Sequence, residues 1–229
     1  MSENIRENFE DLGGKFITEF SVLIKNLECI NTLIFDWDGV FNSGIKSLDE
    51  GNGFNESDAM GINMLRFALW LKNKRLPRAI IVTGEKNSLA ENFAKREHFN
   101  SIYSGVKNKS LVINKIRLAY NIDKKNIACF FDDINDVGMV KECGVRFLMR
   151  KDSSPLFERF IIQKEYCDYV SANSGASQGL REVSELFIGM IGLFSDVVEN
   201  RANNTDQYKK YFLEREKVDT ELFQTLITS

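Results

Sequence analysis

Residues 32–40 read TLIFDWDGV, a short apolar run that ends in two aspartates and a glycine. Such a run is too short for a helix, and a strand covered on both faces is apolar at nearly every position. Further runs of the same kind are AIIV (79–82) and IACFF (127–131), each followed by polar residues, and VRFLM (145–149). The pattern predicts the strands of a parallel sheet.

Stretches with helical spacing separate these runs. Apolar residues recur at helical intervals over about residues 57–74, 89–94 and 111–119, and Ser57 is a candidate cap for the first stretch. Alternating strands and helices predict a doubly wound, Rossmann-like α/β fold with helices on both faces of the sheet. Ligands of such folds bind outside the carboxyl ends of the strands, so the polar residues there should line one crevice.

The composition excludes several classes of protein. Among 229 residues, 43% are hydrophobic and 28% are charged, which is typical of a globular chain. The net charge of -3 argues against a nucleic-acid partner. No uncharged apolar run approaches the roughly 18 residues of a membrane span, and the N-terminus is too polar for a signal peptide. We therefore expect a cytoplasmic protein without nucleic-acid or membrane partners.

The cysteines and the single histidine do not suggest a zinc site. Cys29, Cys129, Cys143 and Cys167 are scattered without a CxxC pair, so we expect reduced and mostly buried thiols. One histidine excludes a multi-histidine site. His98 lies in a polar helical stretch, and we expect it to be solvated.

Carboxylates gather after two of the predicted strands. Asp36 and Asp38 are two residues apart, so both can face the crevice, and FDDIND (131–136) places three more carboxylates after another strand. Each cluster alone could be an acidic turn or the start of a helix. Two clusters at two strand ends favour a cation site, and oxygen ligands without nearby thiol or imidazole indicate Mg²⁺. Paired carboxylates also suit a nucleophile beside a proton donor.

Groups that can bind an anion follow the other strands. The hydroxyl of Thr83 and the backbone N–H of Gly84 could hold a phosphate oxygen, although Thr-Gly is also a common turn. Lys107 and Lys109 precede the third predicted helix, in GVKNKS (105–110). One of them could neutralise a phosphoryl group, whereas most lysines of this kind are simply solvated.

In this order, the motifs resemble those of the haloacid dehalogenase superfamily of phosphatases. The chain is similar to the capless branch that dephosphorylates 3-deoxy-D-manno-octulosonate 8-phosphate (KDO 8-phosphate) or related nine-carbon sugar-acid phosphates. The resemblance covers about residues 30–190, between helical extensions expected at 1–29 and 191–229. The segments that carry it are DWDGV (36–40), Thr83-Gly84, Lys109 and DDIND (132–136), and for the branch DGVFNSG (38–44), Asp58 before Met60-Gly61, YSGVKNK (103–109) and SGASQGLREV (174–183).

The resemblance implies catalytic roles for three residues. Asp36 would attack phosphorus and become an aspartyl phosphate. Asp38 would protonate the leaving alkoxide, then activate water, and its backbone carbonyl would help bind Mg²⁺. Lys109 would be the cation for the phosphoryl oxygens, and it matches better than Lys107 because the lysine of the family opens the following helix.

The resemblance also implies binding roles. Asp132 would ligate Mg²⁺ together with Asp36 and Asp38. The residues expected to bind the substrate are Thr83, Gly84 and Asp58, and those expected to orient the metal ligands or Lys109 are Asp133 and Asp136.

In place of a cap domain, the family branch has a small β-hairpin after the first motif, here matched by residues 44–55. The resemblance implies a homotetramer in which this hairpin packs against its copies and a neighbour covers each site. Residues 174–179 could add a flexible lid. Both segments could instead be ordinary surface loops.

Three residues depart from the pattern of the family: Glu85 stands in place of arginine, Phe131 in place of glycine and Ser43 in place of aspartate. We expect an Mg²⁺-dependent phosphatase of an acidic sugar phosphate, and lipopolysaccharide biosynthesis is the process implied. The alternatives are a non-catalytic interaction module, like the related domains fused to sialate cytidylyltransferases, and a phosphatase of another small metabolite or nucleotide. Metal-dependent release of phosphate would exclude the module.

Overall fold

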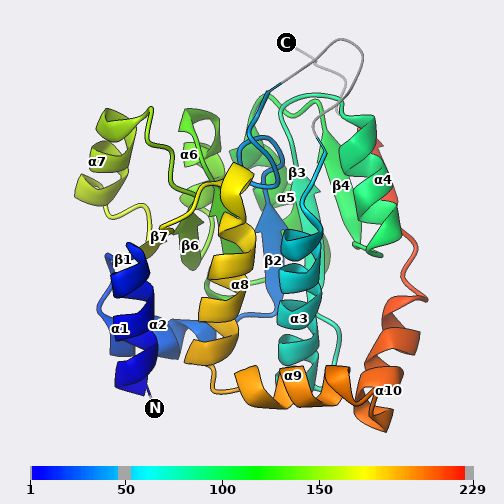
Figure 1. Ribbon diagram of the computed structural model, residues 1–229. Coiled ribbons are helices and arrows are strands. Elements are labelled where there is room, and N and C mark those ends of the chain that lie inside the picture. The colour runs from blue at the N-terminus through cyan, green and yellow to red at the C-terminus, as the bar shows by residue number, and fades with distance from the viewer. Residues whose placement is uncertain (1, 46–52, 225–229) are drawn as a thin grey trace.

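One sheet forms the centre of the protein (Figure 1). The computed structural model describes residues 2–45 and 53–224, and over these residues the sheet has eight strands. They are β1 (Lys15–Phe16), β2 (Thr32–Phe35), β3 (Arg78–Val82), β4 (Ser101–Ser104), β5 (Ile127–Phe131), β6 (Val145–Leu148), β7 (Tyr169–Val170) and β8 (Glu221–Gln224). Their order is β1-β7-β6-β5-β2-β3-β4-β8, and every pair is parallel except β1 with β7.

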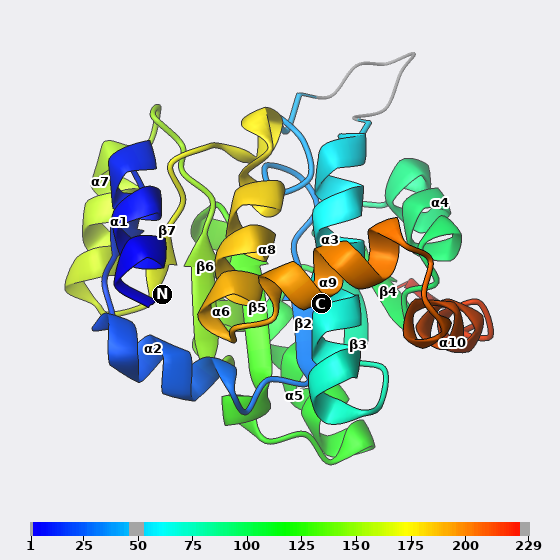
Figure 2. The same ribbon diagram turned by 60° about the horizontal axis from the view of Figure 1, so that its bottom comes forward.

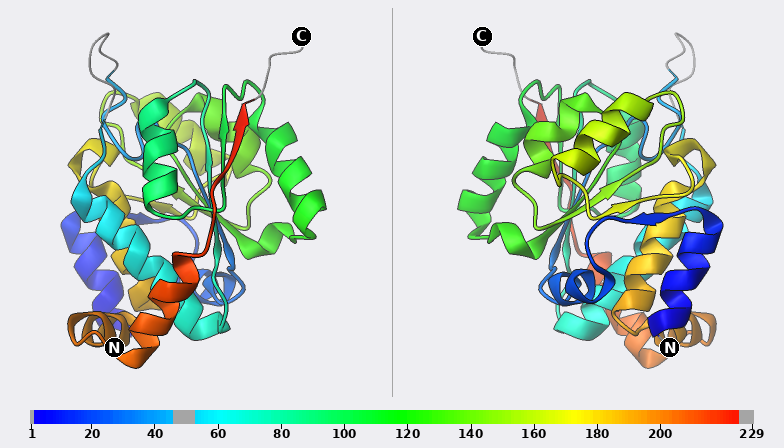
Figure 3. Two further views of the ribbon diagram at one scale, coloured as in Figure 1. Left: turned by 90° about the vertical axis from the view of Figure 1, so that its right-hand side faces the viewer. Right: turned by 90° about the vertical axis from the view of Figure 1, so that its left-hand side faces the viewer.

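The helices lie on both sides of the sheet (Figure 3). They are α1 (Ser2–Leu12), α2 (Phe20–Leu27), α3 (Glu56–Asn73), α4 (Ser88–Arg96), α5 (Lys109–Tyr120), α6 (Val137–Val140), α7 (Pro155–Gln163), α8 (Gly179–Met190), α9 (Phe194–Ala202) and α10 (Asp206–Arg215). Short 3₁₀ turns occupy Lys124–Asn126, Ile134–Asp136 and Gly175–Ser177. This confirms the predicted doubly wound α/β fold.

The central strand β2 shows why its sequence is apolar throughout. Leu33 and Phe35 pack into a hydrophobic cluster with α3, α4 and α8, whereas Ile34 packs into a second cluster with α5, α6 and α7. Successive side chains of a strand point to opposite faces, so burial of both faces requires an unbroken apolar run.

The register of the sheet brings three strand ends together. Phe35 at the end of β2 lies opposite Ile81 of β3 and Phe130 of β5. The residues that follow these strands therefore emerge at one edge of the sheet, as the strand pattern predicts.

Helix α3 begins slightly earlier than expected from the sequence. Its cap is Asn55, whose side-chain oxygen accepts a hydrogen bond from the N–H of Ser57 at 2.8 Å, so Ser57 lies inside the helix. Gly61 lets α3 approach α8 closely, because a Cβ there would lie 3.0 Å from the Cα of Arg181. The two helices form a layer over β2 (Figure 1).

Both terminal segments join the sheet as well as adding helices. Strand β1 pairs with β7 at one edge, and β8 pairs with β4 at the other. Helix α9 lies below α8 and α3 in Figure 1, and in the turned view of Figure 2 it crosses in front of α3. The sequence pattern did not predict either edge strand.

The expectation of a solvated His98 was wrong. Its ring is only 25% exposed, because Nδ1 lies 3.0 Å from the carbonyl oxygen of Val218 and Nε2 lies 3.3 Å from Glu216. The segment that follows α10 therefore packs onto this histidine.

The thiols agree with their expected state: all are free, and those other than Cys29 are buried. Most of the hairpin predicted over residues 44–55 falls on residues 46–52, which lie outside the described part of the chain. Within the described ranges, no helix is long and apolar enough to cross a membrane.

Candidate active site

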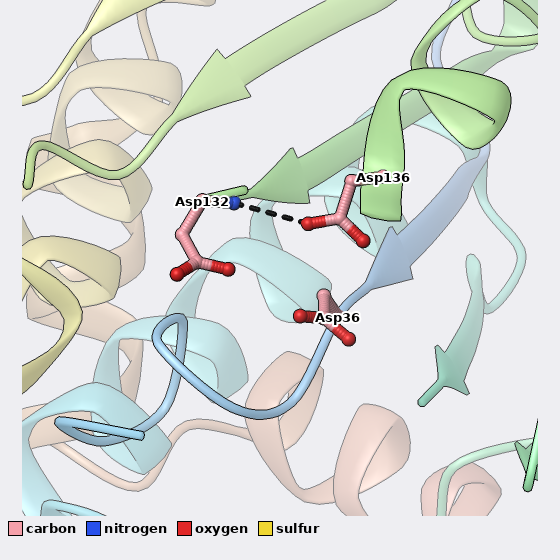
Figure 4. A group of neighbouring side chains, drawn as sticks. All are labelled: Asp36, Asp132 and Asp136. Atoms are coloured by element: carbon pink, nitrogen blue, oxygen red, sulfur yellow. Dashed lines mark hydrogen bonds between the residues drawn. The ribbon is translucent and has the colours of Figure 1, made fainter. Parts of the chain in front are cut away.

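Three aspartates converge at the carboxyl edge of the sheet. Asp36 follows β2, Asp132 follows β5, and Asp136 lies in the 3₁₀ turn Ile134–Asp136. Figure 4 shows their side chains directed toward one another. One carboxylate oxygen from each lies within 4.8 Å of the others, and all three residues are buried.

A buried lysine ties two of these carboxylates together. Lys109 Nζ lies 2.5 Å from Asp36 Oδ1 and 2.5 Å from Asp136 Oδ1. Lys109 is the first residue of α5, after the cap Asn108, so the start of the helix directs it toward the sheet. Lys107 is different, since it is exposed and pairs with Glu85 at 3.1 Å.

Asp136 accepts hydrogen bonds from the backbone of the acidic turn in addition to the one from Lys109. Its Oδ2 accepts hydrogen bonds from the backbone N–H groups of Asp132 and Asp133, each at 3.3 Å. Asp133 in turn caps the same 3₁₀ turn through the N–H of Ile134. Asp136 is therefore fully engaged within the protein and orients both Lys109 and the Asp132 backbone.

Lys151, which the sequence analysis missed, is a second cation at these carboxylates. Its Nζ lies 2.6 Å from Asp132 Oδ2 and 3.0 Å from Asp133 Oδ2. The residue lies three positions beyond the end of β6, so the rule that located the aspartates, a polar residue directly after a predicted strand, points to Arg150 and not to this lysine.

Glycine is required where the loop after β2 meets Asp132. Gly39 has a φ of +85°, and a Cβ there would lie 1.9 Å from Asp132 Oδ2. The Asp36–Gly39 turn is thereby pressed against the second acidic cluster. On its other side, Gly175 contacts the same turn, since a Cβ at Gly175 would lie 2.1 Å from the carbonyl oxygen of Gly39.

Burial and mutual repulsion dominate the electrostatics of the site. Burial, and then the charge of Asp136, raise the pKa of Asp36 to about 8. The same two causes raise the pKa of Asp132 to about 6. Burial opposes the charge of Lys109, but the carboxylates of Asp36 and Asp136 outweigh it and raise the pKa of the lysine. The positive charges of the lysines therefore do not fully offset the repulsion among the carboxylates of the site.

The donor set fits a hard divalent cation. Its ligand atoms are carboxylate oxygens, and the cysteines and His98 lie on other parts of the fold. A divalent ion beside Asp36 and Asp132 would relieve the repulsion that raises their pKa values. Both oxygens of Asp136 accept hydrogen bonds within the protein, one from Lys109 and the other from the backbone N–H groups of Asp132 and Asp133, so Asp36 and Asp132 are the side chains best placed to hold it.

These groups form one wall of a cleft of about 440 Å³. Its lining brings together most of the residues singled out from the sequence. They are Asp36, Asp38, Gly39, Gly44, Thr83, Gly84, Glu85, Val106, Lys107, Lys109, Asp132, Asp133, Asn135, Asp136 and Lys151. Phe131, in contrast, is buried in the hydrophobic cluster under α5.

Asp58, expected to contact the substrate, does not line the cleft. It is fully buried between α3 and α8, where Oδ1 accepts the backbone N–H of Arg181 at 2.8 Å. Its helical position turns the carboxylate toward α8, so within this chain it joins two helices instead of facing a ligand.

Solved structures share this fold. The KDO 8-phosphate phosphatase of Moraxella catarrhalis, in complex with magnesium, phosphate and KDO, is 19% identical, with a TM-score of 0.65 over 80% of this chain and 99% of that one. The cobalt-bound phosphatase of Haemophilus influenzae is 21% identical, with a TM-score of 0.63 over 82% and 99%. The Yersinia pestis KDO 8-phosphate phosphatase is 22% identical, with a TM-score of 0.62 over 75% and 88%.

The sequence itself matches a family profile over half of its length. The match runs from residue 58 to residue 172, so it includes Thr83, Lys109 and Asp132, whereas Asp36 precedes it. The family is described as haloacid dehalogenase-like hydrolases. The chain belongs to this haloacid dehalogenase-like hydrolase family.

Proposed function

We propose that the protein is an Mg²⁺-dependent phosphatase that hydrolyses the phosphate monoester of an acidic sugar, of the KDO 8-phosphate or nonulosonate 9-phosphate type. One observation carries the proposal. Asp36 is a buried carboxylate at the base of the cleft, held by Lys109 and facing Asp132. This arrangement supports roles as nucleophile, cation and metal ligand for Asp36, Lys109 and Asp132.

The first chemical step uses the two aspartates after β2. The Asp36 carboxylate attacks phosphorus, the bond from phosphorus to the sugar oxygen breaks, and an aspartyl phosphate forms. Asp38, which also lines the cleft, gives its proton to the departing oxygen. The Asp36–Gly39 turn, fixed by Gly39 against Asp132, keeps both side chains at the same end of the cleft.

Hydrolysis of the intermediate regenerates the enzyme. Asp38 takes a proton from water, the water oxygen bonds to phosphorus, and the Asp36–phosphorus bond breaks to release phosphate. Lys109, the Thr83 hydroxyl and the Gly84 N–H would bind the phosphoryl oxygens. A divalent ion held by Asp36, Asp132 and the Asp38 carbonyl would neutralise part of the phosphate charge.

The substrate class rests on two lines of support. Structures of the same fold carry the name KDO 8-phosphate phosphatase, and one of them holds magnesium, phosphate and KDO. In this chain, Lys107 and Lys151 line the cleft beside Lys109, and a second acidic group on the substrate would bind them in exchange for their present carboxylate partners.

A panel of phosphate esters tests the proposal. Purified protein is incubated with KDO 8-phosphate, a nonulosonate 9-phosphate, glucose 6-phosphate and a nucleoside monophosphate, in Mg²⁺ or in EDTA, and free phosphate is measured. We expect the highest kcat/KM for a sugar-acid phosphate and no release in EDTA. A preference for a neutral sugar or a nucleotide would contradict the substrate class, and no release from any ester would favour the non-catalytic module.

A further inference from the structure

Lys151 is placed differently from the other cation of the site. Its ammonium contacts Asp132 and Asp133, whereas Lys109 contacts Asp36 and Asp136. The Lys109 side chain is 3% exposed and fixed at the start of α5, but that of Lys151 is 33% exposed. Lys151 can therefore leave its carboxylates for solvent at a much smaller cost.

The oxygen that Lys151 contacts is already crowded. Asp132 Oδ2 lies against the backbone of Gly39 and 2.6 Å from Lys151 Nζ. Asp132 is also the buried carboxylate assigned to the metal. An ammonium and a divalent cation repel each other strongly when they share one buried carboxylate, since little water screens them there.

We propose that Lys151 is the exchangeable counter-ion of the metal site. Its ammonium neutralises Asp132 while no divalent ion is bound, and it must leave Oδ2 when the ion binds. Asp133, whose Oδ2 lies 3.0 Å away, keeps the displaced lysine at the cleft. The inference rests on the proposed function, because it takes Asp132 as a ligand of Mg²⁺.

Two consequences of opposite sign follow. Lys151 competes with the metal, so the Mg²⁺ affinity of the protein is lower than its carboxylates alone would give. Lys151 also pairs a buried carboxylate, so it stabilises the metal-free protein. A lysine with a merely structural role would stabilise the metal-free and metal-bound proteins alike.

Isothermal titration with Mg²⁺ alone tests the first consequence. Lys151→Met removes the charge, Lys151→Arg keeps it, and Lys107→Met removes a charge from the same cleft that pairs with Glu85 instead of Asp132. We expect the Kd for Mg²⁺ to fall about fivefold or more in Lys151→Met. The other two variants should stay within about twofold of the unaltered protein. An unchanged or weaker affinity in Lys151→Met would overturn the inference.

Thermal unfolding tests the second consequence and applies even if one variant is poorly stable. In EDTA, we expect Lys151→Met to unfold at a lower temperature than the unaltered protein. In saturating Mg²⁺, the difference should vanish or reverse, because tighter binding stabilises the folded state. An equal decrease in Tm under both conditions would show a structural role only and reject the exchange.

The two proposals fail in different ways. If the unaltered protein releases phosphate and binds Mg²⁺, but Lys151→Met binds it no more tightly, only the inference on Lys151 is wrong. If the unaltered protein and every variant give flat titrations, the metal site itself is wrong, and the proposed function falls with it.

Discussion

The environment of Asp36 determines when its carboxylate is ionised. A carboxylate with a pKa raised to about 8 by burial and by Asp136 is a poor permanent anion but a strong nucleophile once a cation stabilises it. Lys109 supplies one positive charge at 2.5 Å, and a divalent ion would supply the rest. The ionised form of Asp36, which the proposed mechanism needs, therefore depends on its partners.

The first prediction follows from that dependence. Asp36→Asn keeps the shape of the side chain but removes its charge, so phosphatase kcat should fall by roughly three orders of magnitude or more. Circular dichroism should show an intact fold. Asp123→Asn, at an exposed aspartate remote from the cleft, is the matched control. Near-normal activity in a folded Asp36→Asn protein would remove Asp36 from its assigned role.

The second prediction concerns Asp58 and the pH dependence of the free energy of unfolding. Burial raises its pKa to about 7 despite the hydrogen bond from the Arg181 N–H, and Oδ2 has no hydrogen-bond partner among the residues described. Because the pKa is higher in the folded chain, Asp58 favours folding at pH values below its unfolded pKa of about 4. That contribution is lost as the pH rises through 7.

Asp58→Asn cannot ionise, so it should lack this pH dependence. The unaltered protein should lose stability on going from pH 5 to pH 8 as Asp58 ionises, and the variant should not. The unfolding free energy of the variant minus that of the unaltered protein should therefore rise by up to about 3 kcal/mol between these pH values. Urea denaturation of both proteins at each pH measures this difference. The titration of Asp36 and Asp132 does not affect it, because both proteins contain these residues. Parallel pH profiles for the two proteins would show that Asp58 is not the group responsible.

At the scale of elements, the sequence predicted those parts that are buried on both faces. Strands β2, β3, β5 and β6 are apolar runs because both of their faces are covered. The outer strands, two on each side of these four, were not predictable in this way. β1 and β7 have two residues each, β4 begins and ends with serine, and β8 is exposed throughout. Their pairing depends on long-range contacts, which leave no local periodicity.

The sequence likewise predicted mainly those site residues whose position depends on a buried strand. Aspartates that directly follow buried strands were located from the sequence because the strand ends fix where they emerge. The place of Asp58 outside the cleft was not predictable, because its position on α3 is set by packing against α8, which no local pattern reveals. Lys151 was missed because it lies three residues beyond β6, where the chain has already left the sheet.

The contact between the 3₁₀ turn Gly175–Ser177 and the Asp36–Gly39 turn gives an element-scale prediction. In Gly175→Ala, the added methyl would lie 2.1 Å from the carbonyl oxygen of Gly39, so one of the two turns must move. We expect kcat to fall about tenfold, since small displacements of reacting groups are costly. Gly189→Ala on α8 is the control, because a Cβ there comes no closer than 3.4 Å to its nearest neighbour, the Ile5 side chain. Equal activity of the two variants would show that the contact does not position Asp36.

At the scale of the whole molecule, the cleft is open in a single chain. Its lining includes Glu85 and Lys107, whose side chains are each 57% exposed. Phosphoryl transfer benefits from the exclusion of bulk water. Among the described residues nothing supplies this cover, and a neighbouring subunit would be a simple source of it.

We accordingly predict a homotetramer in which the 44–55 segment lies between subunits. Light scattering should give about four times the chain mass of 26.3 kDa. Ile45, 69% exposed at the beginning of that segment, is the residue to change: Ile45→Glu should dissociate the assembly and lower activity. Leu118→Glu places the same charge at an apolar residue that is 84% exposed on α5, and it should leave the tetramer intact. A fully active monomer at micromolar concentration would show that this chain excludes water from its cleft without a neighbour.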